Sequence, residues 1–203
     1  MLSIDPSNNT ERENYKLLIG SIVPRPIAFV TSLSEDGCIL NGAPFSYFNI
    51  VSSNPPMISL SIQRSGGKQK DTARNILANK EFVVHIVDEQ NVEKVNKTAA
   101  SLPPSQSEVQ LAGLTPIESV NISVPGVKEA KIRMECVLEQ SLELSGVESV
   151  GSDLIIGRIV QFHIEKELYD DGRIDPRGLA AVSRLAGANY AKIGEIFEIE
   201  RPE

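Results

Sequence analysis

The sequence predicts a mainly β protein, built as a closed antiparallel barrel with short helical insertions. Three observations indicate this class. At least six segments are rich in β-branched and apolar residues, as strands are. Clusters of Gly, Pro, Asp and Ser separate them, as expected for turns. The helix-like segments are too few to alternate with strands as in a parallel α/β sheet. Closure into a barrel would also remove exposed strand edges.

The first part of the chain supplies two of the expected strands. Residues 1–14 are polar, so we expect a loosely held N-terminal arm, followed at 15–19 by a short helical or extended lead-in. Residues 27–33 are β-branched and aromatic-rich, which favours a strand. A turn around Gly37 is expected to return the chain as a second strand over residues 38–41.

The middle of the chain mixes strands with two short helices. Residues 57–62 alternate apolar and small polar side chains, the pattern of a half-buried strand. Asp71 can cap a helix that ends near Asn79. Residues 82–87 are strand-like, and residues 89–100 can be helical.

The second half is expected to be β-rich. Residues 101–127 hold four prolines and predict a long excursion over the surface. Two long β runs, 131–144 and 153–168, are joined by the small and polar segment 145–152. Residues 193–200 are expected to form a last strand.

The length of the chain predicts a single domain over residues 1–203. Its composition excludes several classes of function. The net charge of −7 argues against general affinity for nucleic acid, which needs a basic surface. The chain has no run of about 18 apolar residues and no secretory signal pattern, so we expect a cytoplasmic protein without membrane spans. Two scattered cysteines and two histidines do not have the spacing of a metal site.

One stretch, residues 41–60, departs from this ordinary background. It combines three aromatic side chains with Ser, Asn and Pro, and is too polar for plain core but too apolar for a plain loop. Such a segment suits a flat heteroaromatic ligand, held by backbone amides at its polar edge and by aromatic side chains on its faces. Because neighbours in an extended segment point to opposite sides, at least one of Phe45, Tyr47 and Phe48 is expected in the core.

Six short motifs follow one another along the chain. They are PRPIA at 24–28, APFSYF at 43–48, SNPP at 53–56, KDTARN at 70–75, GRIV at 157–160 with Phe162 and His163, and RLAG at 184–187 with Tyr190. With these motifs the chain resembles the flavin reductase-like family, from about residue 15 to residue 200. The resemblance implies an FMN-binding split β-barrel with Greek-key-like strand order.

Two positions depart from the family's pattern. The chain has Ala186 and Gly187 where a double glycine is frequent, which affects how closely this segment can approach the ring. His85 stands where Asn is common, and the sequence leaves open whether His85 faces the ligand.

The resemblance implies that the helix start near Asp71 binds the phosphate of FMN. Helix N-termini attract anions. Lys70 and Arg64 add positive charge, Lys68 raises the local potential further, and Thr72 offers a hydroxyl. The residues alone leave a capped surface helix with solvated lysines as the alternative.

The resemblance also assigns the flavin ring to the segment around Pro44. Its consecutive amides can meet the polar edge of the ring, Ser46 can add a hydroxyl near N5, and an aromatic residue can pack on the ring. Asn41 is a further candidate for binding the ring. A structural role, in which its side chain bonds to unpaired groups at the end of a strand, is an equally open alternative. The residues implied for the ring are Asn41, Ala43, Pro44, Phe45, Ser46, Tyr47 and Phe48.

Three further residues are implied at the flavin face or near the nicotinamide. His163 lies on the second long β run and is the candidate catalytic residue, with a structural role as the alternative. Arg184 and Tyr190 flank small residues, so they could cover the ring or receive a nicotinamide nucleotide. A packing turn with a surface arginine is the alternative for this segment.

The leading hypothesis is therefore an FMN-dependent oxidoreductase that takes hydride from NADH or NADPH onto flavin N5. Its reduced flavin could serve a partner monooxygenase, and a homodimer is expected because split-barrel relatives place the flavin between subunits. The alternative is an FMN-binding protein without turnover that carries electrons or flavin. A barrel that binds oligonucleotides is a third hypothesis, which the acidic balance disfavours. No pattern in the sequence distinguishes NADH from NADPH, or bound FMN from dissociating FMN.

Overall fold

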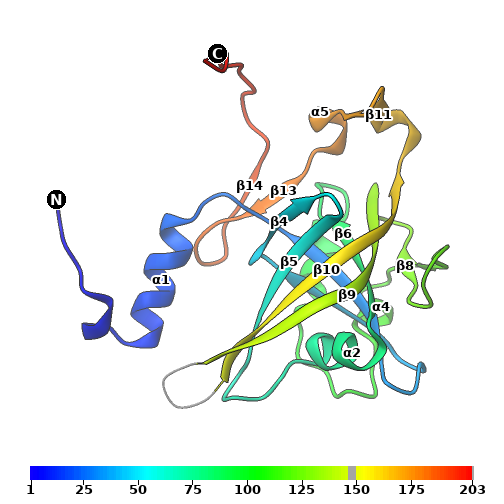
Figure 1. Cartoon of the computed structure of the whole chain (residues 1–203), viewed down its shortest axis with the longest axis horizontal. Helices are drawn as coiled ribbons and strands as arrows, with labels where there is room; N and C mark the ends of the chain where they lie inside the picture. Colours follow the sequence, from blue (N-terminus) through cyan, green and yellow to red (C-terminus); the bar gives the residue numbers. More distant parts are fainter. Residues whose placement is uncertain (146–149, 203) are drawn as a thin grey trace.

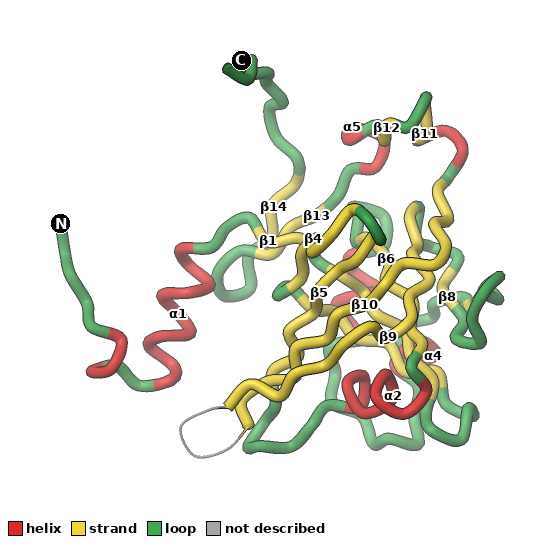
Figure 2. The backbone as a smooth tube through the Cα atoms, in the orientation of Figure 1, coloured by secondary structure: helices red, strands yellow, loops and turns green. Residues whose placement is uncertain are grey.

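A seven-stranded antiparallel sheet that curls into a barrel forms the centre of the molecule (Figures 1 and 2). The computed structural model describes residues 1–145 and 150–202. The mainly β class predicted from the sequence is confirmed. In spatial order the strands are β3 (Leu40–Phe45), β2 (Ala28–Leu33), β6 (Glu81–Ile86), β9 (Ile132–Ser145), β10 (Val150–Ile164), β5 (Pro56–Gln63) and β4 (Phe48–Ser53).

The barrel is split at one seam, between β3 and β4. These strands follow each other in the sequence, yet each stands at an edge of the sheet: β3 pairs with β2, and β4 pairs with β5. Ser46 and Tyr47 form the bend that carries the chain across the seam. The closed barrel expected from strand count is therefore corrected to a split one. We did not predict β4 as a strand, although Ile50 and Val51 carry the β-branched signal for it.

Strand β2 is buried on both faces because two separate hydrophobic clusters pack against it. Ala28 and Val30 belong to the cluster inside the barrel, which also holds Phe82 and residues of α2. Ile27, which precedes β2, and Phe29 face a second cluster outside it. This explains why residues 27–30 are continuously apolar rather than alternating.

The segment 101–127 builds part of that second cluster. Val109, Leu114 and Val127 are buried within it. The surface excursion expected from its prolines is therefore corrected: this segment covers the outer face of β2. It contains one short helix, and its end forms a two-stranded ribbon of β7 (Pro116–Ile117) and β8 (Gly126–Val127).

Short helices connect and flank the strands of the barrel. The described helices are α1 (Glu11–Ser21), α2 (Asp71–Asn79), α3 (Val92–Lys97), α4 (Glu108–Leu111) and α5 (Pro176–Leu179), with 3₁₀ turns η1 (Pro6–Asn8) and η2 (Lys166–Leu168).

Two helix starts differ from the prediction. Helix α1 begins at Glu11, inside the arm expected over 1–14, because Thr10 and Glu13 form a reciprocal capping box. Helix α2 has Lys70, not Asp71, as its cap residue, and no side chain bonds to its first amides. The N-terminus of α2 is therefore left open for a ligand.

A small sheet joins the two ends of the chain beside the barrel. Strand β1 (Arg25–Pro26) pairs with β13 (Val182–Arg184), which pairs with β14 (Tyr190–Lys192). A hairpin of β11 (Tyr169–Asp170) and β12 (Arg173–Ile174) precedes it. The last strand expected at 193–200 is wrong: these residues are exposed and non-regular, because no strand edge lies beside them.

Helix α1 and the C-terminal tail project away from the barrel (Figures 1 and 2). Both carry exposed apolar side chains, among them Leu18 and Ile22 on α1 and Phe197 and Ile199 on the tail. No helix among residues 1–145 and 150–202 has the length and apolar character needed to cross a bilayer.

The long hairpin of β9 and β10 contains a glycine that the core requires. At Gly157 the ladder shifts register, and a methyl group added there would lie 2.3 Å from Cζ of Phe82. Phe82 is fully buried, so its ring has little freedom to move.

Gly157→Ala is expected to lower the free energy of unfolding by about 1–3 kcal/mol, because the new methyl overpacks against Phe82. Gly20→Ala in α1, with nothing within 4 Å, is the control and is expected to be neutral or stabilising by about 0.5–1 kcal/mol. Urea denaturation of both variants measures this difference. Unchanged stability of the Gly157 variant would contradict the packing described here.

Candidate functional site

The candidate site is a cleft at the seam of the barrel. It consists of two adjoining hollows of about 370 and 150 Å³, which together fall in the size range of small-molecule sites. The two hollows share walls from α1, from the β3–β4 bend, from the start of α2 and from β13. The shared lining residues are Tyr15, Pro44, Phe45, Ser46, Lys70 and Arg184.

The larger hollow has an apolar wall and a polar clasp. Val92, Val95 and Ala99 of the α3 region supply the apolar side. In the same hollow Arg184 stacks on the ring of Tyr190, with its guanidinium carbon 4.4 Å from the ring centroid. The clasp is fixed at both ends. Arg184 donates to the carbonyl of Gly187 (2.7 Å), and the Tyr190 hydroxyl donates to Asn96 Oδ1 (2.9 Å).

The smaller hollow offers unused hydrogen-bonding groups. The hydroxyl of Tyr47 is buried and has no hydrogen-bond partner among the described residues. Burial raises the pKa of this phenol. The amides of Ser46 and Tyr47, in the bend between the edge strands, likewise donate to no acceptor in the described part of the chain. Because such groups are costly to leave unpaired, they indicate a polar ligand.

The cleft is electropositive in an acidic protein. Arg25, Lys70 and Arg184 line it, and no Asp or Glu does. None of the three forms an ion pair within residues 1–145 and 150–202. The chain as a whole has a net charge of −7. A local cluster of cations without counter-charges favours an anionic ligand.

The open N-terminus of α2 adds to this potential. The amides of Asp71, Thr72 and Ala73 have no acceptor among the described residues. Lys70 precedes them, and its Nζ lies 5.9 Å from the centroid of the Phe45 ring. Helix N-termini with free amides and a neighbouring ammonium are suited to phosphate.

A larger groove, of about 610 Å³, lies at the other end of β3. Leu40, Val109, Leu111 and Leu114 line it together with uncharged polar residues. Its lining contains no charged side chain, so it cannot neutralise a phosphate. The seam cleft is therefore the better candidate for an anionic ligand despite its smaller volume.

Asn41 and Thr72, predicted to bind the cofactor, belong instead to a buried polar network beneath α2. The Thr72 hydroxyl donates to Asn41 Oδ1 (2.9 Å), and Asn41 Nδ2 donates to Glu108 Oε2 (2.9 Å). Burial raises the pKa of Glu108. Neither predicted side chain lines the cleft, although the Thr72 amide remains at the helix start.

Three further predicted side chains also lie elsewhere. Arg64 is bound by Asp153 (2.6 Å) and Glu143 (2.5 Å), so its charge is already neutralised. The side chains of Ala43 and Phe48 pack against the barrel core. The cleft brings together the remaining cofactor-binding predictions, Pro44, Phe45, Ser46, Tyr47, Lys70, Arg184 and Tyr190.

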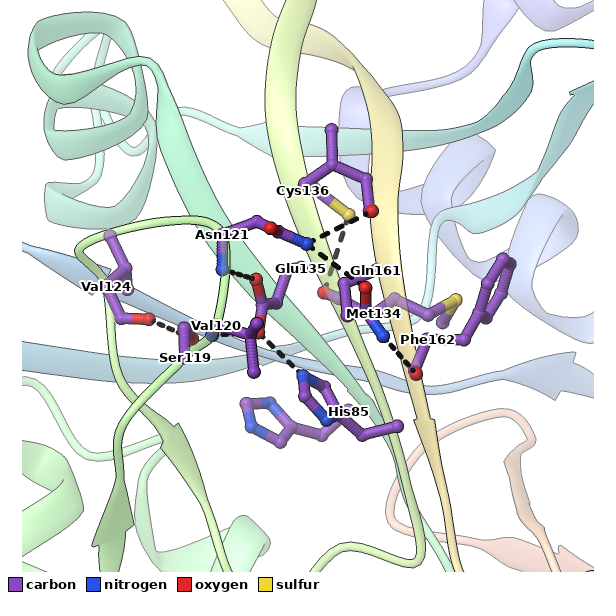
Figure 3. Close-up of polar contacts among 12 residues, drawn as sticks. His85, Ser119, Val120, Asn121, Val124, Met134, Glu135, Cys136, Gln161 and Phe162 are labelled. Carbon is purple, nitrogen blue, oxygen red and sulfur yellow. Dashed lines mark hydrogen bonds and ion pairs between the residues drawn. The ribbon is translucent and has the colours of Figure 1, made fainter.

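His163, predicted to be the catalytic residue, does not line the cleft, and its catalytic role stays a prediction. Its Nε2 lies 2.6 Å from Oε1 of Glu135. Figure 3 shows the buried Glu135 carboxylate meeting the loop that holds Val120 and Asn121, whose amides both donate to it at 2.7 Å. Burial would raise the pKa of Glu135, but these amides and His163 outweigh it and hold that pKa below its ordinary value.

His85 does not line the cleft either. It is buried, with Nδ1 2.9 Å from the carbonyl of Phe29, while Nε2 accepts from the Val127 amide at 2.9 Å. This pairing requires a neutral ring with its proton on Nδ1. Burial lowers the pKa of His85 to about 4. The bond to the Phe29 carbonyl acts in the opposite direction, and the positive charges of Arg133 and His163 add to the lowering.

The sequence reasoning missed several cleft residues, notably Tyr15, Arg25, Ser61 and Gln63. Alternation along β5 could have found Ser61 and Gln63, because Leu60 and Ile62 face the core on the other side. The feature that could have identified Arg25 is its position between two prolines in the first motif. The described residues contain no group of three His, Cys, Asp or Glu side chains that could hold a metal ion.

Known proteins share this architecture. The profile described as "Flavin reductase like domain" matches residues 19–178. Nitrilotriacetate monooxygenase component B from Bacillus cereus is 62% identical, with a TM-score of 0.96 and 98% of each chain covered. The 2-nitrobenzoate 2-nitroreductase NbaA of Pseudomonas fluorescens is 31% identical, with a TM-score of 0.89 over 99% of this chain and 96% of that one.

A structure with a split barrel domain from Shewanella frigidimarina shows the same fold at 20% identity, with a TM-score of 0.83 over 97% of this chain and 96% of that one. The chain thus belongs to the flavin reductase-like family, and both the resemblance and the split-barrel fold predicted from it are confirmed.

The burial of His85 gives stability a defined pH dependence. The folded state holds the pKa near 4, against 6.5 for the ordinary side chain, so the unfolded chain binds the proton first as the pH falls. The free energy of unfolding is therefore expected to decrease between about pH 6.5 and pH 4, and to be fully retained above that window. His85→Asn, which keeps a donor near the Phe29 carbonyl, is expected to flatten this part of the profile. Thermal unfolding across the window measures it, and identical slopes for both proteins would contradict the neutral buried ring.

Proposed function

We propose that the protein binds FMN in the seam cleft and reduces it with NADH or NADPH. The observation that carries this proposal is the cleft lined by Arg25, Lys70 and Arg184 without a single carboxylate, in a chain of net charge −7. Membership in the flavin reductase-like family supplies the ligand class.

The residues of the cleft fit FMN in each of its parts. The phosphate suits Lys70 and the free amides that open α2. The polar edge of the ring system suits the unpaired amides of Ser46 and Tyr47 and the orphaned hydroxyl of Tyr47. The apolar wall from α3 can exclude water from the remaining surface. Without a ligand these groups would pay a desolvation penalty with no compensating partner.

The bound flavin would supply the redox chemistry, accepting a hydride equivalent from the nicotinamide and passing electrons onward. The protein's own part is to bind, orient and shield. Lys70 and the α2 amides would anchor the phosphate, the β3–β4 bend would fix the ring's polar edge, and the clasp of Arg184 and Tyr190 would border the space beside the apolar wall. No side chain of the cleft is required as a proton donor, which suits the absence of histidine from its lining.

The reduced flavin is proposed to serve a separate monooxygenase. The support is the similarity to nitrilotriacetate monooxygenase component B, at 62% identity over nearly the full length. The free cysteines, Cys38 and Cys136, suit a reducing, cytoplasmic location. A homodimer is proposed because large apolar side chains are exposed on the projecting α1 and C-terminal tail, such as Leu18 and Phe197, and on the edge strand β4, at Ile50.

The proposed activity predicts that the purified protein binds FMN with one site per chain and that NADH or NADPH bleaches the bound flavin in the absence of oxygen. Stopped-flow absorbance with each nicotinamide measures the reduction rate. Stoichiometric FMN binding without bleaching by either nucleotide would remove the reductase activity and leave a flavin or electron carrier.

The proposed phosphate site predicts a loss of FMN affinity in Lys70→Ala of about tenfold, because a charge-assisted contact to the phosphate disappears. Riboflavin, which lacks the phosphate, is expected to bind Lys70→Ala and the wild type equally. Lys128→Ala, which removes an exposed lysine remote from the cleft lining, is the matched control. Fluorescence titration gives both affinities, and an equal loss for FMN and riboflavin would exclude a phosphate contact.

A further inference from the structure

Arg25 is a buried arginine whose partners are neutral oxygens. Only 6% of the residue is exposed, and it forms no ion pair within the described chain. It donates to the carbonyls of Ile19 (2.8 Å), Ile22 (2.7 Å) and Leu185 (3.0 Å), and makes a long contact to Ser46 Oγ (3.4 Å). Four of its five N–H groups therefore bind three separate segments.

The first of these segments is the C-terminal end of α1. Ile19 and Ile22 lie at the last turn and the cap of α1, where carbonyls have no helical partner. The last turn of α1 contains no basic residue of its own, so Arg25 supplies the cation that favours a helix C-terminus. Ile19 is the one buried residue of α1, and the helix stands clear of the barrel (Figure 1). Arg25 is thus a main polar link between α1 and the barrel.

The second segment is the turn between β13 and β14. Arg25 pairs with Arg184 in the β1–β13 ladder, and its side chain holds the carbonyl of the next residue, Leu185. The same turn carries Gly187, whose carbonyl fixes Arg184. The third segment is the β3–β4 bend, which Arg25 reaches at Ser46. All three segments carry lining residues of the smaller hollow: Tyr15 and Ile19, Leu185 and Gly187, and Ser46 and Tyr47.

We infer that Arg25 is a positioning residue of the cleft, which fixes α1 and the β13–β14 turn as walls against the β3–β4 bend. The identity of the ligand rests on the proposed function. The contacts by which Arg25 joins the three segments do not depend on any ligand. Lysine cannot replace it, because a single ammonium on a flexible stem cannot span three segments as the planar guanidinium does. The two flanking prolines limit the backbone freedom of the strand that presents it.

The test uses Arg25→Gln and Arg25→Lys, with Arg12→Gln as the control that removes the same charge from an exposed position of α1. Hydrogen exchange read by mass spectrometry reports each segment without any ligand, and circular dichroism establishes that the barrel is folded. In both Arg25 variants, exchange of residues 11–22 and 185–190 is expected to accelerate by about tenfold or more, while β6, β9 and β10 remain protected. Should Arg25→Gln fail to fold, Arg25→Lys carries the same comparison.

The second readout is FMN affinity by fluorescence titration. Both Arg25 variants are expected to bind FMN about tenfold more weakly or worse, with Arg12→Gln unchanged. Unaltered exchange in the two segments would overturn the inference whatever the ligand is. Accelerated exchange with unaltered FMN affinity would overturn the role of these walls in binding. A wild-type protein that binds no FMN would refute the proposed function instead, and the exchange data would still decide the role of Arg25.

Discussion

The seam between β3 and β4 is the constraint on which the candidate site depends. Consecutive strands usually pair with each other, but here the bend at Ser46 and Tyr47 sends them to opposite edges of one sheet. The amides of the bend remain unpaired, although the Tyr47 carbonyl accepts from the Ser61 amide of β5 at 2.9 Å. A closed barrel would have satisfied these groups with a neighbouring strand. The split leaves them for a ligand, at the place where α1, the start of α2 and the β13–β14 hairpin converge.

Electrostatics then favours one hollow as the candidate site for an anionic ligand. The groove beside Leu111 is larger, but its walls hold no charge. The seam cleft is smaller and concentrates three cations, with no carboxylate, in a protein that is acidic overall. Several carboxylates elsewhere have partners of their own: Asp153 and Glu143 pair with Arg64, and Glu135 binds His163 and two amides. No carboxylate lines the seam cleft to offset its three cations.

The strands of the barrel could be predicted because local patterns encode them. Residues 57–62 alternate as a half-buried strand should, and residues 27–30 are all apolar because clusters pack on both faces of β2. The failures have non-local causes. Residues 193–200 have strand composition but no neighbouring edge, and whether an edge is present is a property of the whole fold. The split itself was implied by the family resemblance, since strand count alone favoured closure.

The position of the candidate cleft could be predicted from a local backbone motif, whereas the surroundings of several side chains could not. The motif at residues 43–48 marked the bend correctly, and Lys70 lies in the cleft as expected. Thr72 and Arg64 were assigned by their chemistry, but partners distant in sequence, Asn41 and Asp153, bind them first. Arg25 was missed because its role depends on Leu185, 160 positions away.

The most direct test of the central claim is a crystal structure of the protein with FMN. We expect the phosphate at the first-turn amides of α2 beside Lys70, and the polar edge of the ring against the bend at Ser46 and Tyr47. Flavin density in the uncharged groove beside Leu111, with the seam cleft filled only by water, would contradict the account.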